Sequence, residues 1–147
     1  MSVTDTRYPV AKSGGELARR TALGVLAGVV LAAVVVVLGV DLLGLDVLQP
    51  GEDRVMSPFG VPAVLSAVVA GTGAAVAYAA LVRYTGRPTR NFGILSAVVF
   101  ALMLVPVFAF APEQGVAEGA GQALLVALHA AVAVPLVAFI SGAVARH

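Results

Sequence analysis

The chain has 147 residues, of which 60% are hydrophobic and only 12% are charged, and its mean hydropathy is +1.00. Soluble domains carry about 25% charged residues, so these residues cannot cover the surface of a soluble enzyme of this size. Nine basic residues against eight acidic ones give a net charge of +1, which leaves no basic excess for binding nucleic acid. Because the chain has no cysteine, disulfides and iron–sulfur clusters are excluded as well.

The first predicted element is a helix that begins near Ser13. Ser13 and Glu16 have the spacing of a capping box, in which the glutamate follows the capping serine by three residues. We therefore expect residues 1–12 to form a short disordered cytoplasmic tail and residues 13–147 to form one domain. The uncharged stretch that follows predicts a membrane span over about residues 21–40, because roughly 20 apolar residues cross the hydrocarbon of a bilayer.

Three further apolar stretches are long enough to cross a membrane. They predict spans over about residues 60–82, 91–111 and 120–143. Each stretch is apolar on every face, whereas the strands of a membrane β-barrel alternate apolar and polar residues. The predicted fold is therefore all-α, a polytopic four-helix bundle in the membrane.

The charged residues predict how this bundle is oriented. Lysine and arginine lie before the first span, between the second and third spans and after the fourth, whereas the other two loops carry mainly aspartate and glutamate. The positive-inside rule places the basic loops in the cytoplasm, so we expect a multi-pass protein of the cytoplasmic membrane with both termini inside. The predicted cytoplasmic anchors are Arg19, Arg20, Arg83, Arg87 and Arg90, the first two at the depth of the lipid headgroups.

Small residues are the candidates for helix packing, because helices associate in membranes through close contact of small side chains. The first span contains Gly24 and Gly28, four residues apart. The second span carries a small residue at every fourth position: Ala63, Ala67, Gly71, Ala75 and Ala79. Two interpretations are open. These residues pack within one four-helix bundle, which we favour, or they form an interface between copies of the chain.

His129 is the candidate for chemistry inside the membrane. The predicted spans contain no Asp, Glu, Lys or Arg, and an ionisable residue at such a depth is a candidate for function. Met103 lies at a similar depth, and a His and Met pair can ligate haem iron or a soft metal. The alternative, which we favour, is a neutral His129 that is hydrogen-bonded to a hydroxyl or carbonyl of a neighbouring helix. On that interpretation no catalytic, metal or cofactor site is predicted.

Three short motifs follow one another along the second half of the chain. They are the loop Tyr84-Thr-Gly-Arg87-Pro88-Thr-Arg90-Asn-Phe92, the Leu104-Val105-Pro106 of the third span and the Leu128-His129 of the fourth. With these motifs the chain resembles, over about residues 19–145, a family of small four-span prokaryotic membrane proteins of unknown function. Asn91 and Gly93 depart from the more basic or hydroxylated loop expected of that family. The resemblance implies the four-span fold and no activity, cofactor or partner.

The expected function is that of a structural or accessory membrane subunit. The sequence has no Gly-rich phosphate loop, nucleophile motif or paired acid and base, so we do not expect an enzyme. One alternative is a binder or carrier of a small apolar molecule, a lipid or quinone, between the helices. A second alternative is a haem or metal protein that uses His129. The expected partners are the lipid bilayer and, as open alternatives, other membrane proteins or a second copy of the chain, but no nucleic acid.

Overall fold

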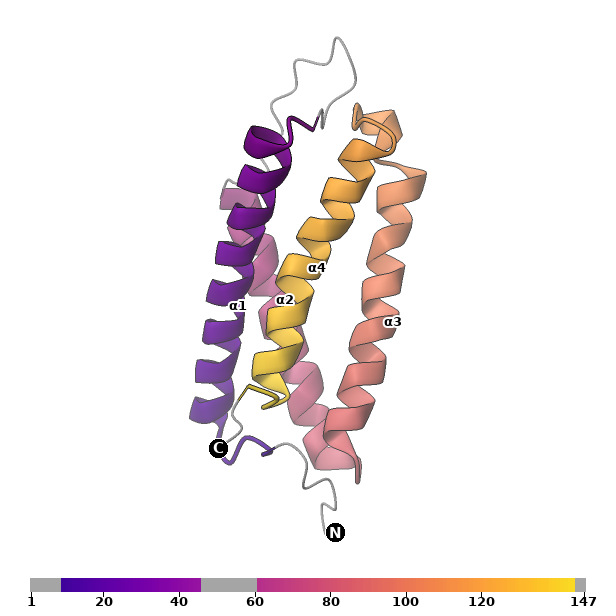
Figure 1. The fold of residues 1–147 in the computed structure, drawn as a ribbon. Coiled ribbons are helices and arrows are strands. Elements are labelled where there is room, and N and C mark those ends of the chain that lie inside the picture. Colours follow the sequence, from indigo (N-terminus) through magenta and orange to yellow (C-terminus); the bar gives the residue numbers. More distant parts are fainter. Residues whose placement is uncertain (1–8, 46–60, 145–147) are drawn as a thin grey trace.

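The described part of the chain folds into four long helices (Figure 1). The computed structural model describes residues 9–45 and 61–144. The helices are α1 (Gly14–Val36), α2 (Val61–Tyr84), α3 (Pro88–Ala109) and α4 (Ala120–Ile140), with a π-helix η1 (Val37–Leu42) that extends α1 and a 3-10 helix η2 (Pro112–Gln114) that precedes α4. No strand occurs within the described ranges, and the predicted all-α four-helix fold is confirmed.

The predicted N-cap at Ser13 starts α1. The Ser13 Oγ accepts a hydrogen bond from the backbone N–H of Glu16 at 3.2 Å. The Glu16 carboxylate accepts the backbone N–H of Lys12 at 2.8 Å, one residue before the N–H that a regular capping box uses. Lys12, which was expected to belong to the disordered tail, is therefore attached to the helix. Residues 1–8 of that tail lie outside the described residues.

Proline and glycine set two of the other helix ends. Pro88 occupies the first turn of α3, where its fixed φ suits a helix and its missing N–H is not needed, so α3 begins three residues before the start of the predicted membrane span. The last helix ends at Ile140, three residues before the end of the predicted membrane span. The reason is Gly142, whose φ of +80° is the left-handed conformation in which helices commonly end.

The helix pair α1 and α4 is in the most extensive contact. A Cβ atom added to Gly24 would lie 3.1 Å from the Leu136 Cα, and one added to Gly28 would lie 3.1 Å from the Val132 Cα. Two helix backbones approach this closely only where the residue between them has no side chain. The same contacts show that the two helices are antiparallel, so the start of α1 and the end of α4 lie at the same end of the bundle (Figure 1).

A buried cluster that contains two aromatic side chains packs at the end of the bundle where α2 is connected to α3. Tyr78 and Phe92 are fully buried, and their rings pack edge to face with centroids 5.2 Å apart and an interplanar angle of 73°. Leu136 and Ile140 of α4 complete this cluster. The Tyr78 hydroxyl is buried without a hydrogen-bond partner in the described part of the chain, so the residue stabilises the bundle through the packing of its ring.

Most large apolar side chains lie on the outside of the bundle. Leu26, Val69 and Leu102, from three different helices, are 62%, 70% and 63% exposed. All four helices are long and apolar enough to cross a membrane. Such side chains would be costly to expose to water, whereas lipid tails are as apolar as leucine. The chain is therefore a multi-pass membrane protein.

Arg19 and Arg20 are neighbours in the sequence but have different surroundings. Arg19 is exposed, whereas Arg20 is buried. The Arg20 guanidinium donates hydrogen bonds to the Glu16 carboxylate at 2.5 Å and to the carbonyl oxygen of Pro9 at 2.8 Å. It also contacts Gly142, where an added Cβ would lie 2.7 Å from the Arg20 Nη1. Arg20 therefore links the segment before α1 to the turn after α4, whereas the headgroup depth expected for both arginines stays a prediction.

We expect Arg20→Gln to lower the stability of the detergent-solubilised protein by about 1–3 kcal/mol. The substitution removes the charged donor from both the Glu16 carboxylate and the Pro9 carbonyl. Arg19→Gln is the matched control, and as a surface change it should alter stability by less than about 0.5 kcal/mol. Thermal denaturation followed by circular dichroism measures both variants. Equal losses of stability would contradict the linking role of Arg20.

Candidate functional site

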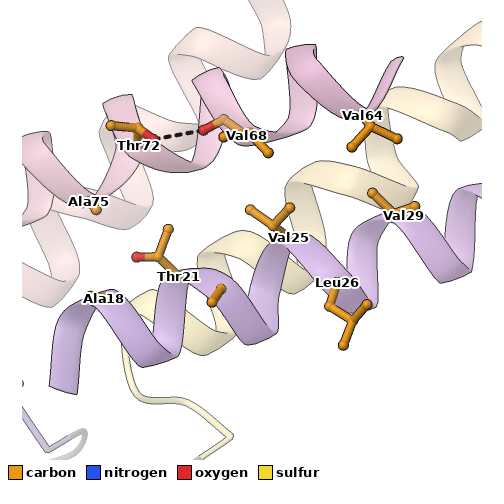
Figure 2. Close-up of a pocket in the computed structure, with 10 residues that line it drawn as sticks. Ala18, Thr21, Val25, Leu26, Val29, Val64, Val68, Thr72 and Ala75 are labelled. Carbon is orange, nitrogen blue, oxygen red and sulfur yellow. Dashed lines mark hydrogen bonds between the residues drawn. The ribbon is translucent and has the colours of Figure 1, made fainter. Parts of the chain in front are cut away.

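An open groove runs between α1 and α2 (Figure 2). Its volume is about 570 Å³, within the range of about 300–1,000 Å³ that is typical of small-molecule sites. On α1 the lining residues are Ala18, Thr21, Ala22, Val25, Leu26 and Val29, and on α2 they are Val64, Val68, Thr72 and Ala75. Both walls belong to helices that are long and apolar enough to cross a membrane, so we expect the groove to open to lipid.

The groove stays open because small side chains line it. Gly71 brings the two helices together, because a Cβ added there would lie only 2.6 Å from the Val25 Cγ2. Beside this contact, Ala18, Ala22 and Ala75 present methyl groups alone. The space between the helices therefore stays open, and a larger side chain at any of these three alanines would occupy it.

The groove is apolar although two threonines line it. The Thr21 hydroxyl donates to the carbonyl oxygen of Leu17 at 2.9 Å. The Thr72 hydroxyl donates to the carbonyl oxygen of Val68 at 2.8 Å, the bond drawn in Figure 2. Both hydroxyl hydrogens are thus engaged by their own helices, four residues back. A ligand in the groove would meet alkyl groups, and the chemistry of this lining suits a hydrocarbon chain.

The small-residue stripe predicted on α2 is divided between different surroundings. Ala67 and Gly71 are buried. Ala75 lines the groove, and Ala79 is exposed. The side chain of Ala63 lies outside the described residues. Residues four apart on a straight α-helix are rotated by about 40° from one another, so five of them drift by about 160° and cannot all face one neighbour.

The packing glycines and the groove lie on different faces of α1. Gly24 and Gly28 face α4, whereas Ala18, Ala22 and Leu26 line the groove beside α2. The structure therefore shows two sets of residues on α1, of which only the glycines were predicted to pack. One set holds α1 against α4, and the other leaves room beside α2.

His129 lies in the middle of α4 and is partly buried. Its Nδ1 is 2.7 Å from the carbonyl oxygen of Leu125; since a carbonyl only accepts, the Nδ1–H donates this bond. The bond stays within α4 and differs from the clasp to a neighbouring helix expected from the sequence, because residues four apart lie one above the other on a helix. Met103 of α3 is 47% exposed. In the described ranges no three His, Asp or Glu side chains gather as at a metal centre.

The other predicted anchors surround the connection between α2 and α3. Arg83, Arg87 and Arg90 are exposed. The Arg83 guanidinium carbon lies 5.7 Å from the centroid of the Tyr84 ring, a distance typical of a cation–π contact. With the exposed Arg19 at the start of α1, these residues make this end of the bundle basic.

We expect His129→Leu to change the stability by less than about 1 kcal/mol, because the lost hydrogen bond joins no two helices. Thermal denaturation in detergent measures this change. The absorption spectrum and the metal content of the wild-type protein are recorded in the same preparation. A stoichiometric haem or metal that disappears in the variant would contradict this expectation and would make His129 a ligand.

Comparison with known families places this architecture. Residues 12–146 match the family of unknown function DUF6069. The chain belongs to this family. The match covers all four helices, the groove and His129, and it confirms the resemblance to a four-span family of unknown function. No curated protein and no solved structure matches the chain. Membership in DUF6069 therefore assigns no activity, and the groove is the structural feature that suggests a function.

Proposed function

We propose that this DUF6069 member is a non-enzymatic accessory protein of the cytoplasmic membrane that binds a small apolar molecule between α1 and α2. The observation that carries this proposal is the groove of about 570 Å³, lined by alkyl groups in the membrane-spanning part of the two helices. A site of this size without a free polar donor binds its ligand through apolar contact. Lipids and quinones are the ligand classes that such a lining accommodates.

Organic extraction tests this proposal. The wild-type protein is purified in a mild detergent, extracted with organic solvent and analysed by mass spectrometry for lipids and quinones. We expect a near-stoichiometric apolar molecule in the wild type and its loss in Ala22→Leu and Ala75→Leu, which fill the groove from opposite walls. Ala33→Leu, an exposed position of α1 outside the groove, is the control and should retain it. Equal extracts from all four proteins would refute the proposal.

A structural subunit with a protein partner is the second candidate, and the middle of α3 favours it. Ile94, Val98 and Leu102 are exposed. Gly93 and Ala97 on the same helix are exposed as well, and nothing lies within 4 Å of a Cβ added to Gly93. Small residues on an uncovered helix are suited to packing against another membrane helix. Recovery of a stoichiometric protein partner after mild solubilisation, lost in Ala97→Leu, would support this candidate over the first.

We also infer that both termini face the cytoplasm, because the exposed arginines gather at one end of the bundle. The chain has no cysteine, so single cysteines report sidedness without background. In intact cells an impermeant maleimide should label Glu118→Cys and should label Arg87→Cys only after the membrane is ruptured. The reverse pattern would overturn this orientation.

A further inference from the structure

The groove has the length of one lipid acyl chain. Its walls run from Ala18 to Val29 on α1 and from Val64 to Ala75 on α2, eleven residue steps on each helix. At a rise of about 1.5 Å per residue this is about 16 Å. The hydrocarbon core of a bilayer is about 30 Å thick, so the groove is about as long as one leaflet is thick.

The leaflet is the one that faces the basic end of the bundle. Ala18 lies near the start of α1, directly before the exposed Arg19. On α2, Ala75 lies in the middle of the helix, and it is the lining residue on the side of the exposed Arg83. The other end of the groove lies at Val29, near the middle of the span Gly14–Leu42 on α1, and at Val64, near the start of α2. A lipid whose chain fills the groove would thus place its headgroup beside arginine.

Arg19 is the arginine that is free to bind that headgroup. It directly follows Ala18 at the mouth of the groove and lies three residues before Ala22, so it shares a helix face with the lining. Its side chain is exposed, and no hydrogen bond or ion pair joins it to another described residue, whereas the Arg20 guanidinium is engaged by Glu16 and Pro9. A long side chain on a helix points toward the N-terminus, which here is the direction of the headgroups, and guanidinium groups bind phosphate well.

We propose that the groove holds one acyl chain of an anionic phospholipid from the leaflet at the basic end, with Arg19 contacting the lipid phosphate. This inference rests on the proposed function, because it names the ligand of the same groove. A quinone fits the observations less well, since its carbonyl groups would need hydrogen-bond donors and the hydroxyls of Thr21 and Thr72 donate to their own helices. A zwitterionic lipid lacks the net charge that a free guanidinium selects.

Native mass spectrometry of the full chain tests the ligand. The purified protein is incubated with equal amounts of phosphatidylglycerol and phosphatidylcholine that carry identical acyl chains. We expect the wild type to retain one lipid and to prefer phosphatidylglycerol by about fivefold, the preference that one arginine near a membrane surface provides. Arg19→Gln should retain one lipid without this preference, and Ala22→Leu should retain neither.

Two controls separate the outcomes. Arg90→Gln removes an exposed arginine that is not beside the groove and should keep the preference, and Ala75→Leu repeats the groove test from the other helix. Equal retention of both lipids by the wild type, with loss of both in Ala22→Leu, would overturn the anionic ligand and leave the apolar site standing. Retention of no lipid by the wild type, or full retention by both groove variants, would overturn the proposed function as well.

Discussion

Gly28→Leu is expected to destabilise the detergent-solubilised protein by about 1–3 kcal/mol or more, the range for forcing a larger side chain into a packed interface. The new side chain would start 3.1 Å from the Val132 Cα and 3.4 Å from its carbonyl oxygen. Both atoms belong to the backbone of α4, so no rotamer change can make room and the two helices must separate. Thermal denaturation measures the loss, and reduced yield of the monodisperse protein accompanies it.

Gly73→Leu is the matched control for Gly28→Leu. Gly73 also lies inside a membrane helix, and nothing lies within 4 Å of a Cβ added there. Both substitutions replace glycine in a helix interior, so they gain the same helix propensity of about 1 kcal/mol. The difference between them therefore reports the contact of α1 with α4. If Gly73→Leu were as destabilising as Gly28→Leu, the close contact between these helices would not hold the bundle together.

The second large effect is expected for Gly142→Ala. Its φ of +80° costs an L-residue roughly 1–2 kcal/mol. The added Cβ would also lie 2.7 Å from both the Arg20 Nη1 and the Pro9 carbonyl oxygen, and would push apart the two partners of a 2.8 Å hydrogen bond. Together these effects predict a loss of about 2–4 kcal/mol in thermal stability.

Gly44→Ala is the control that separates backbone strain from the steric clash with Arg20 and Pro9 in Gly142→Ala. Gly44 has a φ of +61°, and nothing lies within 4 Å of an added Cβ, so its substitution carries the backbone cost alone. We expect it to destabilise less than Gly142→Ala by the value of the Arg20 contacts. Combining Gly142→Ala with Arg20→Gln should then cost less than the sum of the single variants, because they break the same link. Additive losses would contradict a shared contact.

The membrane helices could be predicted from the sequence because each is apolar on all faces over a length that fits a bilayer. The start of α1 could be predicted as well, since Ser13 is a local signal that needs no neighbouring helix. The glycine pair of the first span pointed to a close approach, although not to its partner. Only the structure shows that Gly24 and Gly28 face α4.

The groove and the Arg20 link could not be predicted, because both depend on how the helices are rotated about their axes. Arg19 and Arg20 are identical residues in adjacent positions, yet about 100° of helical rotation leaves one exposed and the other buried. Helix rotation also decides the surroundings of Ala18 and Ala22, a second pair of small residues four apart. Their spacing is that of a packing motif, but they line the groove. The position of the neighbouring helix decides whether small residues pack against that helix or line a groove.

The central claim, that an acyl chain occupies the groove between α1 and α2, is tested most directly by photo-crosslinking. The full chain is reconstituted with a phosphatidylglycerol that carries a diazirine on one acyl chain, irradiated and mapped by peptide mass spectrometry. We predict that labelling concentrates on residues 18–29 and 64–75 and exceeds that of the middle of α3, although Val98 and Leu102 there are 52% and 63% exposed. Labelling that follows exposure alone, with α3 labelled as heavily as the groove, would contradict the claim.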